Sequence, residues 1–292
     1  MPTLRCPRRP SGRLLAATFL AATSLALTAA APGAGAQVPP PLRSPHWIMD
    51  ADAIRVLDAD EEAFGSDGDE LQLVVIAFRT TMGARGSTQA WKVNSLREIC
   101  TGMDDGDRCT IPNGDGRVDF GTVQRPTALQ MAAGRGPELI GTVQLVIEND
   151  GTSNSIMNPL MDRLVEGTRR ELAAVSEGIT RFDPANLAAA TAAFDGIGDR
   201  VLSYIDRTWL QDAAIWLSSG GDPDDFMGYR INLQVGVDPA LRDQVNLALL
   251  LAFFTPESKI AASVIGNSGL ALPYSDNDTA YELDTRVFVT LV

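Results

Sequence analysis

Two kinds of hydrophobic pattern alternate along the chain, and the first predicts strands. Residues 71–80, LQLVVIAFRT, are almost all apolar or β-branched, as in a strand buried on both faces. Residues 138–150 form a similar run, and strict alternation over 227–237 and 281–292 indicates two more strands. Because the alternating positions of 227–237 are polar, we expect that strand to have one face in water.

The second pattern predicts helices in mid-chain. Asn158-Pro159 is a helix-start signal, and apolar residues at helical spacing follow it from Leu160 to Ile179. Asp183-Pro184 repeats this signal before a second stripe, and residues 208–219 are expected to form a third, short helix. The first two helices read as an α-hairpin.

A later helix is expected to begin at Asp238-Pro239 and to be buried over 240–254, although the second half of that run also fits a strand. Helices that cluster in mid-chain, rather than alternating with strands, favour an α+β fold. We therefore predict a mainly antiparallel β-sandwich with an inserted α-helical hairpin.

The N-terminal segment has the features of a secretory signal peptide. Four arginines precede or flank an Ala/Leu-rich run, and Ala34 and Ala36 fit the small-x-small rule before a cleavage site. We expect residues 1–36 to be the signal peptide, cleaved after Ala36, and 37–50 to be a Pro-rich leader. Residues 51–292 are then one domain, with a helical insertion at about 156–218. The predicted location is secreted, or extracellular.

Net charge restricts the classes of partner. The chain carries −13 at pH 7, and loss of the four arginines of residues 1–36 leaves about −17. Such a chain is not expected to bind nucleic acid, nor to bind an anionic membrane directly. An extracellular protein or a glycan is the expected kind of partner.

Two cysteines remain after residue 36, Cys100 and Cys109. Two cysteines nine residues apart in an exported chain predict one disulfide that closes a short loop. A zinc site would need more ligands than these two thiols and the single histidine supply.

Catalytic motifs are missing from the sequence. His46 is the only histidine, and no nucleophile elbow, zinc-protease helix or phosphate-binding loop is present. We therefore expect a binding or structural module and assign no catalytic residue. A secreted hydrolase that uses carboxylates stays open as an alternative, as does a partner-binding factor of the inhibitor or toxin-component type with the α-hairpin as contact surface.

Three acidic loops each lead into a predicted strand, and all three are rich in oxygen ligands. Their candidate ligands are Asp67, Asp69 and Glu70; Asp222, Asp224 and Asp225; and Asp276 and Asp278. Ca²⁺ takes about six to eight such oxygens, often from several loops. Solvated turns, or for Asp222-Pro223 a helix start, would explain the same residue types. The sequence predicts a Ca²⁺ site if the loops share one end of a sandwich.

Two segments resemble the synaptotagmin-type calcium-binding β-sandwich, the C-two family. SDGDELQLVV is similar to its first calcium loop and following strand, and DPDDFMGYRINL is similar to a later loop with paired aspartates. The resemblance implies an eight-stranded sandwich with calcium at one end, with Asp67, Asp224 and Asp225 as ligands. The spacing of about 155 residues between the segments requires an insertion.

Residues 111–120, IPNGDGRVDF, look like a metal loop at first sight. With Gly116 at the sixth position of a calcium loop, Asn113, Asp115 and Asp119 fall on ligand positions. The first and twelfth positions are then Ile111 and Thr122, so the strongest ligands are missing. We expect a β-hairpin turn here instead, with the next strand beginning near Val118.

Overall fold

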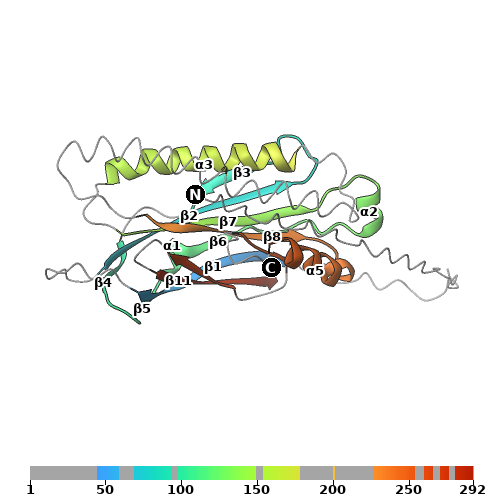
Figure 1. Ribbon diagram of the computed structural model, residues 1–292. Coiled ribbons are helices and arrows are strands. Elements are labelled where there is room, and N and C mark those ends of the chain that lie inside the picture. The colour runs from blue at the N-terminus through green and yellow to red at the C-terminus, as the bar shows by residue number, and fades with distance from the viewer. Residues whose placement is uncertain are drawn as a thin grey trace, which may run out of the picture. The chain divides into compact units, whose positions relative to one another are not determined.

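The computed structural model describes residues 45–58, 69–93, 98–148, 154–177, 200, 226–253, 260–265, 270–275 and 280–291. All of them belong to one compact unit, Arg43–Val292. The predicted signal peptide, the second and third helices and most of the three acidic loops lie outside the described residues. Strands make up most of what is described, in two sheets with few helices (Figure 1).

The first sheet has the order β10-β11-β1-β5, with β6 also paired to β1. Its strands are β1 (Pro45–Asp58), β5 (Arg108–Thr110), β6 (Arg117–Asp119), β10 (Leu270–Ser275) and β11 (Ala280–Leu291). Every described pairing in it is antiparallel. Because β1 begins at Pro45, it takes in the last six residues of the predicted leader, where Trp47 and Met49 are buried.

The second sheet has the order β3-β2-β7-β8-β9, with β4 also paired to β2. Its strands are β2 (Asp69–Thr81), β3 (Gln89–Lys92), β4 (Glu98–Met103), β7 (Glu138–Glu148), β8 (Phe226–Gly236) and β9 (Ile260–Val264). The β8–β9 pair is parallel, unlike the other described pairings of this sheet. The exception follows from the helical segment between these two strands, since a parallel neighbour needs a crossover.

That crossover begins as the sequence predicts. The Asp238 side chain accepts a hydrogen bond from Ala240 N–H at 2.9 Å and caps the 3₁₀ turn η2 (Pro239–Leu241). The helix α5 (Arg242–Phe253) follows directly, so the second half of the run is helical and the strand alternative is wrong.

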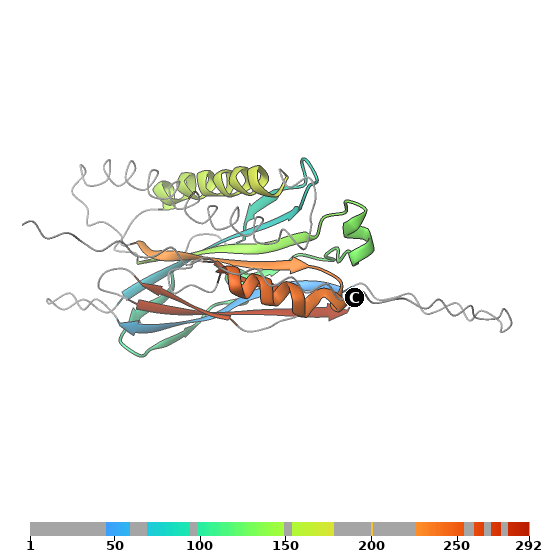
Figure 2. The ribbon, with the colours of Figure 1, turned by 45° about the vertical axis from the view of Figure 1, so that its right-hand side comes forward.

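Helix α3 (Asn154–Ser176) lies between β7 and β8 in the chain and packs on the second sheet beside β2 and β3 (Figures 1 and 2). It begins four residues before Asn158, so the predicted N-cap is wrong and Pro159 lies in the second turn. The hydrophobic contacts of a helix decide its length more than a start signal does. Here Met161, Leu164 and Leu172 are buried against the sheet.

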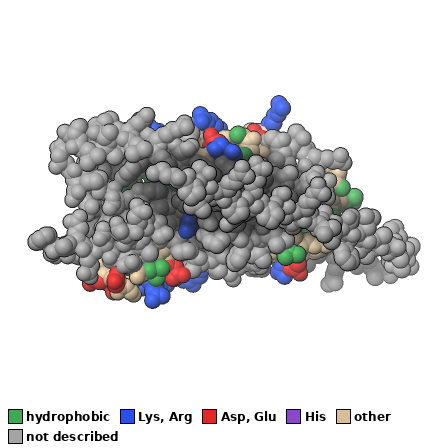
Figure 3. All heavy atoms as spheres, in the orientation of Figure 1, with side chains coloured by type: hydrophobic (Ala, Val, Ile, Leu, Met, Phe, Trp, Pro, Cys, Tyr) green, Lys and Arg blue, Asp and Glu red, His purple; other side chains and the backbone are tan. Residues whose placement is uncertain are grey.

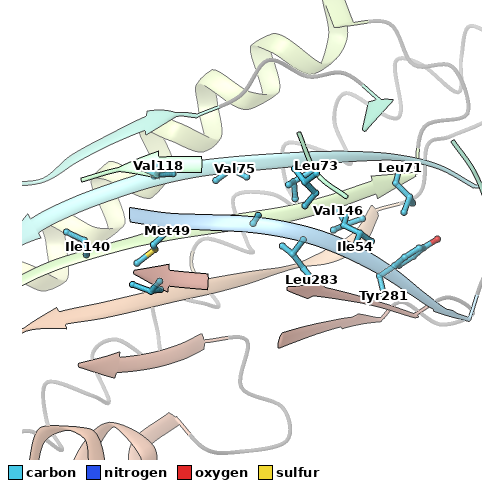
Figure 4. Close-up of a cluster of buried hydrophobic side chains, with 14 of the residues drawn as sticks. Met49, Ile54, Leu71, Leu73, Val75, Val118, Ile140, Val146, Tyr281 and Leu283 are labelled. Atoms are coloured by element: carbon cyan, nitrogen blue, oxygen red, sulfur yellow. The ribbon is translucent and has the colours of Figure 1, made fainter. Parts of the chain in front are cut away.

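Period-two alternation gives the second sheet two buried faces. Val74, Ile76 and Phe78 of β2 belong to the cluster that includes α3, whereas Leu73 and Val75 belong to a second cluster. This inter-sheet cluster combines side chains of both sheets, as Figure 4 shows for Leu73, Val146, Ile54 and Leu283.

The expected wet face of β8 is wrong. Asn232 and Gln234 are 0% exposed, as buried as the apolar residues beside them. Period-two alternation describes polarity, and it cannot show that another layer covers the polar face. The strand β10 of the first sheet contacts β8.

The hairpin expected at 111–120 is also wrong. Strands β5 and β6 both pair antiparallel with β1, one after the other, and the single helical turn α1 (Asn113–Gly116) lies between them. The turn packs directly on β1, because a Cβ added at Gly116 would lie 2.2 Å from the Ala51 carbonyl oxygen. N-G-D-G turn chemistry is local, whereas this pairing with β1 is not.

Candidate cation site at one end of the two sheets

Three strand ends lie side by side at one end of the second sheet. Leu71 near the start of β2 pairs with Glu148 at the end of β7, and Ile147 pairs with Phe226 at the start of β8. The first acidic loop therefore leads into β2, and the loop with Asp222, Asp224 and Asp225 leads into β8, on either side of the end of β7.

In the first sheet, the third loop joins β10 to β11 at one end of the sheet. Ser275, the last residue of β10, pairs with Ala280, the first residue of β11, and Ala280 pairs with Asp58 at the end of β1. The first loop leaves β1 at Asp58, so its departure point and both ends of the third loop are register neighbours.

These ends of the two sheets meet at the turn between β4 and β5. Met103 pairs with Asp69 in the second sheet, while Val56 of β1 donates to the Asp107 carbonyl at 2.9 Å and accepts from Gly106 N–H at 3.1 Å. In Figure 4, Leu71 and Tyr281 lie toward the same end of the inter-sheet cluster, and Ile140 lies toward the other. We call this end of the molecule the acidic end.

The predicted disulfide is confirmed, and it lies between the sheets. Cys100 of β4 and Cys109 of β5 are joined at an S–S distance of 2.03 Å. Because β4 pairs with β2 and β5 pairs with β1, the bond connects the second sheet to the first. It thereby fixes the β4–β5 turn at the acidic end.

The predicted ligands themselves are only partly placed. Asp69 and Glu70 are the first two residues of β2, at the acidic end. The other six predicted ligands, Asp67, Asp222, Asp224, Asp225, Asp276 and Asp278, lie outside the described residues. Within the described ranges, no group of three or more His, Cys, Asp or Glu side chains is arranged to hold a metal ion.

A fourth acidic segment at this end escaped the sequence reasoning. Asp104, Asp105 and Asp107 form the β4–β5 turn, and all three are exposed. Asp107 Oδ2 accepts the Asp104 N–H at 3.1 Å, which stabilises the turn. Figure 3 shows acidic side chains at the lower left, where Figure 1 places β4 and β5. Its signal was the D-D-G-D string between the cysteines.

Three carboxylates on the strands of the first sheet, Asp50, Asp52 and Asp284, lie near arginines. Asp52 pairs with Arg286, and Arg108 lies 3.1 Å from Asp284 and 3.9 Å from Asp52. Burial raises the pKa of the nearby Asp50, and the positive charges of Arg117 and Arg286 oppose that shift. These acids are neutralised by the protein itself, so they are poor candidates for a cation site.

The only histidine of the sequence, His46, has an acidic neighbour. His46 Nδ1 lies 3.4 Å from Asp119 Oδ2. The Gly121 backbone N–H, 2.7 Å from the other carboxylate oxygen, is the main cause that lowers the pKa of Asp119, and His46 adds to it. No serine or cysteine contacts this pair among the described hydrogen bonds.

Comparisons with protein-family models, with curated proteins and with solved structures found no match to this chain. Among the described helices, none is both long enough and apolar enough to cross a membrane.

Proposed function

We propose that the chain is a secreted binding or structural module whose acidic end is stabilised by Ca²⁺. The observation that carries the proposal is the register of the strand ends. In the first sheet, the points where the first and third loops meet the strands are register neighbours. In the second sheet, the points where the first and second loops meet the strands lie on either side of the end of β7.

Chain connectivity keeps several carboxylates near those points. Asp225 immediately precedes Phe226, and Asp276 immediately follows Ser275. Consecutive Cα atoms are only about 3.8 Å apart. Phe226 and Ser275, the strand residues next to these acids in the sequence, lie at the acidic end of the second and the first sheet. Sheets that pack face to face are separated by about 10 Å.

Carboxylates gathered at one end of the molecule would repel one another without a counterion. Two unit charges about 4 Å apart repel by roughly 1 kcal/mol in water and by several times more near a protein surface. A cation with about six to eight oxygen ligands at 2.3–2.6 Å converts that repulsion into binding energy. Ca²⁺ suits flexible loops that supply carboxylates from several segments.

The same proposal includes the finer architecture, a mainly antiparallel β-sandwich with a helical hairpin inserted between β7 and β8. Support comes from the hydrophobic cluster shared by the two sheets and from α3 at the start of that insertion. The resemblance to the synaptotagmin-type family is consistent with it, since calcium there lies at one end of a sandwich. The parallel β8–β9 pair is a departure from a purely antiparallel sandwich.

Export is part of the proposal. It is supported by the signal-like segment at 1–36 and by the Cys100–Cys109 disulfide, since disulfides persist in oxidising compartments.

Thermal unfolding with and without Ca²⁺ tests the proposal. For a Kd of about 10⁻⁴ M, 5 mM Ca²⁺ stabilises a folded protein by roughly 2 kcal/mol, or several degrees in Tm. We expect EDTA to lower Tm and excess Ca²⁺ to restore it, with a smaller effect of Mg²⁺. An unchanged Tm between EDTA and millimolar Ca²⁺ would refute the proposal.

A further inference from the structure

The face of the second sheet that is turned toward the first sheet carries a polar layer. On β7, Ile140 and Val146 belong to the inter-sheet cluster, so the even-numbered residues between them point the same way. On β8, the odd residues Ile231 and Leu233 pack on the other face. The described members of the polar layer are Thr142, Gln144, Asn232, Gln234, Ser263 and Thr285.

Part of this layer is hydrogen-bonded within itself. Gln144 of β7 donates to the Thr285 hydroxyl of β11 at 3.1 Å, which joins the two sheets. Gln234 donates to the Asn232 side-chain oxygen at 3.3 Å and accepts from the Ser263 hydroxyl at 2.9 Å. Gln144, Gln234 and Thr285 are each at most 2% exposed, so water from outside does not contribute.

Two atoms of the layer differ from the rest. Thr142 Oγ1 and Asn232 Nδ2 are buried and have no hydrogen-bond partner in the structure, although their residues are 1% and 0% exposed. Thr142 and Asn232 are direct register partners on β7 and β8. Buried polar groups are nearly always hydrogen-bonded, so two such atoms side by side call for a common explanation.

The register partners of Thr142 and Asn232 on the strands to either side are small. Across the second sheet, the register runs from Ala77 through Thr142 and Asn232 to Ala261. Opposite side chains on an antiparallel pair have Cβ atoms about 5 Å apart, so their polar ends can share one small molecule. Alanine on both sides contributes only a methyl group to the space between the sheets.

We propose that Thr142 and Asn232 bind an internal water molecule between the two sheets. The water accepts a hydrogen bond from Asn232 Nδ2 and donates one to Thr142 Oγ1, or accepts the hydroxyl proton. Buried waters typically make about three hydrogen bonds to groups that lack other partners. The site takes a small neutral ligand, because no described charged side chain lies in its row.

Magnetic relaxation dispersion of water nuclei, which counts long-lived internal waters, tests the proposal. We expect the double variant Thr142→Val, Asn232→Leu to lose at least one such water relative to the wild type. Thr142→Ser keeps the hydroxyl and should keep the water, and Thr122→Val at an exposed position is the matched control. An equal number of internal waters in the wild type and in the folded double variant would overturn the proposal.

A high-resolution crystal structure of the wild type provides a second test that does not depend on the stability of any variant. Electron density for a water within hydrogen-bond distance of both Thr142 Oγ1 and Asn232 Nδ2 supports the site. Direct packing of these atoms against other protein groups, or density for a larger bound molecule, refutes it.

Discussion

Glu138 is a buried carboxylate at the end of the second sheet opposite the acidic loops, and its side chain is 5% exposed. It accepts hydrogen bonds from Arg79 Nε at 2.9 Å and from the Gln124 backbone N–H at 2.7 Å, and it also pairs with Arg79 Nη2. Arg79 in turn donates to the carbonyl oxygens of Phe120 and Thr122 at 3.1 and 3.2 Å. The pair thus attaches the segment 120–124 to β2 and β7.

Glu138→Gln keeps the size of this side chain and removes its charge. The amide retains one acceptor, but its NH₂ group faces donors where the second carboxylate oxygen was. Removing one partner of a buried ion pair costs about 3–5 kcal/mol, and hydrogen bonds to charged groups contribute about 1.5–3 kcal/mol each. Because Gln keeps part of the bonding and Arg79 is 29% exposed, we expect a loss of about 2–3 kcal/mol.

Urea denaturation followed by circular dichroism measures this loss, with the m-value expected to stay constant. Hydrogen exchange at the Gln124 amide should also become faster, because that amide loses its charged acceptor. Glu166→Gln is the matched control, since Glu166 pairs with Arg169 at the surface of α3. We expect no measurable effect there. Equal effects of the two substitutions would refute the reasoning.

Three further predictions concern stability. Replacing Cys100 and Cys109 by serine should cost about 2–3 kcal/mol, from the entropy of a loop of about ten residues, as measured by urea denaturation; an unchanged midpoint would contradict this. Gly116→Ala should lower Tm by several degrees, because its Cβ would meet the β1 backbone, whereas Gly114→Ala in the same turn, where nothing lies within 4 Å, should not. Asp119 has a pKa lowered in the folded state, so its contribution is present above the unfolded pKa of about 3.9 and is lost as pH falls through the folded value. Below about pH 4, the free energy of unfolding should therefore fall less steeply with decreasing pH in Asp119→Asn than in the wild type, as measured by urea denaturation at a series of pH values.

The sequence predicted those elements whose own pattern decides them. The apolar run at 71–80 and the alternation at 281–292 are parts of β2 and β11, and Asp238-Pro239 does start a helical segment. For β2 and β11 the local pattern and the burial agree. The helix at 240–254 was expected to be buried, and that part of the prediction is wrong, because Leu247 is 58% exposed.

Errors occurred where a distant strand decides the outcome. The polar face of β8 is buried because the other sheet covers it, and the N-G-D-G segment is a helical turn because β5 and β6 share β1 as a partner. Hydropathy and turn propensity are local quantities, and neither contains this pairing. The inward polar residues Thr142 and Asn232 escaped notice for the same reason.

The acidic loops lie between these two cases. The sequence indicated which residues had ligand chemistry, but only the strand register shows that the strand ends beside them lie at one end of the two sheets. The turn with Asp104 and Asp107 lies at the acidic end because β4 pairs with β2 and β5 pairs with β1, and these pairings are between segments distant in the sequence.

Calorimetric titration of Ca²⁺ into chelator-treated protein tests the central claim, that the three loops form one cation site. We expect saturable binding in the wild type, weakened at least tenfold by Asp67→Asn, by Asp225→Asn and by Asp276→Asn, each in a different loop. Asp243→Asn, an exposed acid on α5, should bind as the wild type does. Absence of saturable binding in the wild type, or unchanged affinity in any of the three loop variants, would contradict the single shared site.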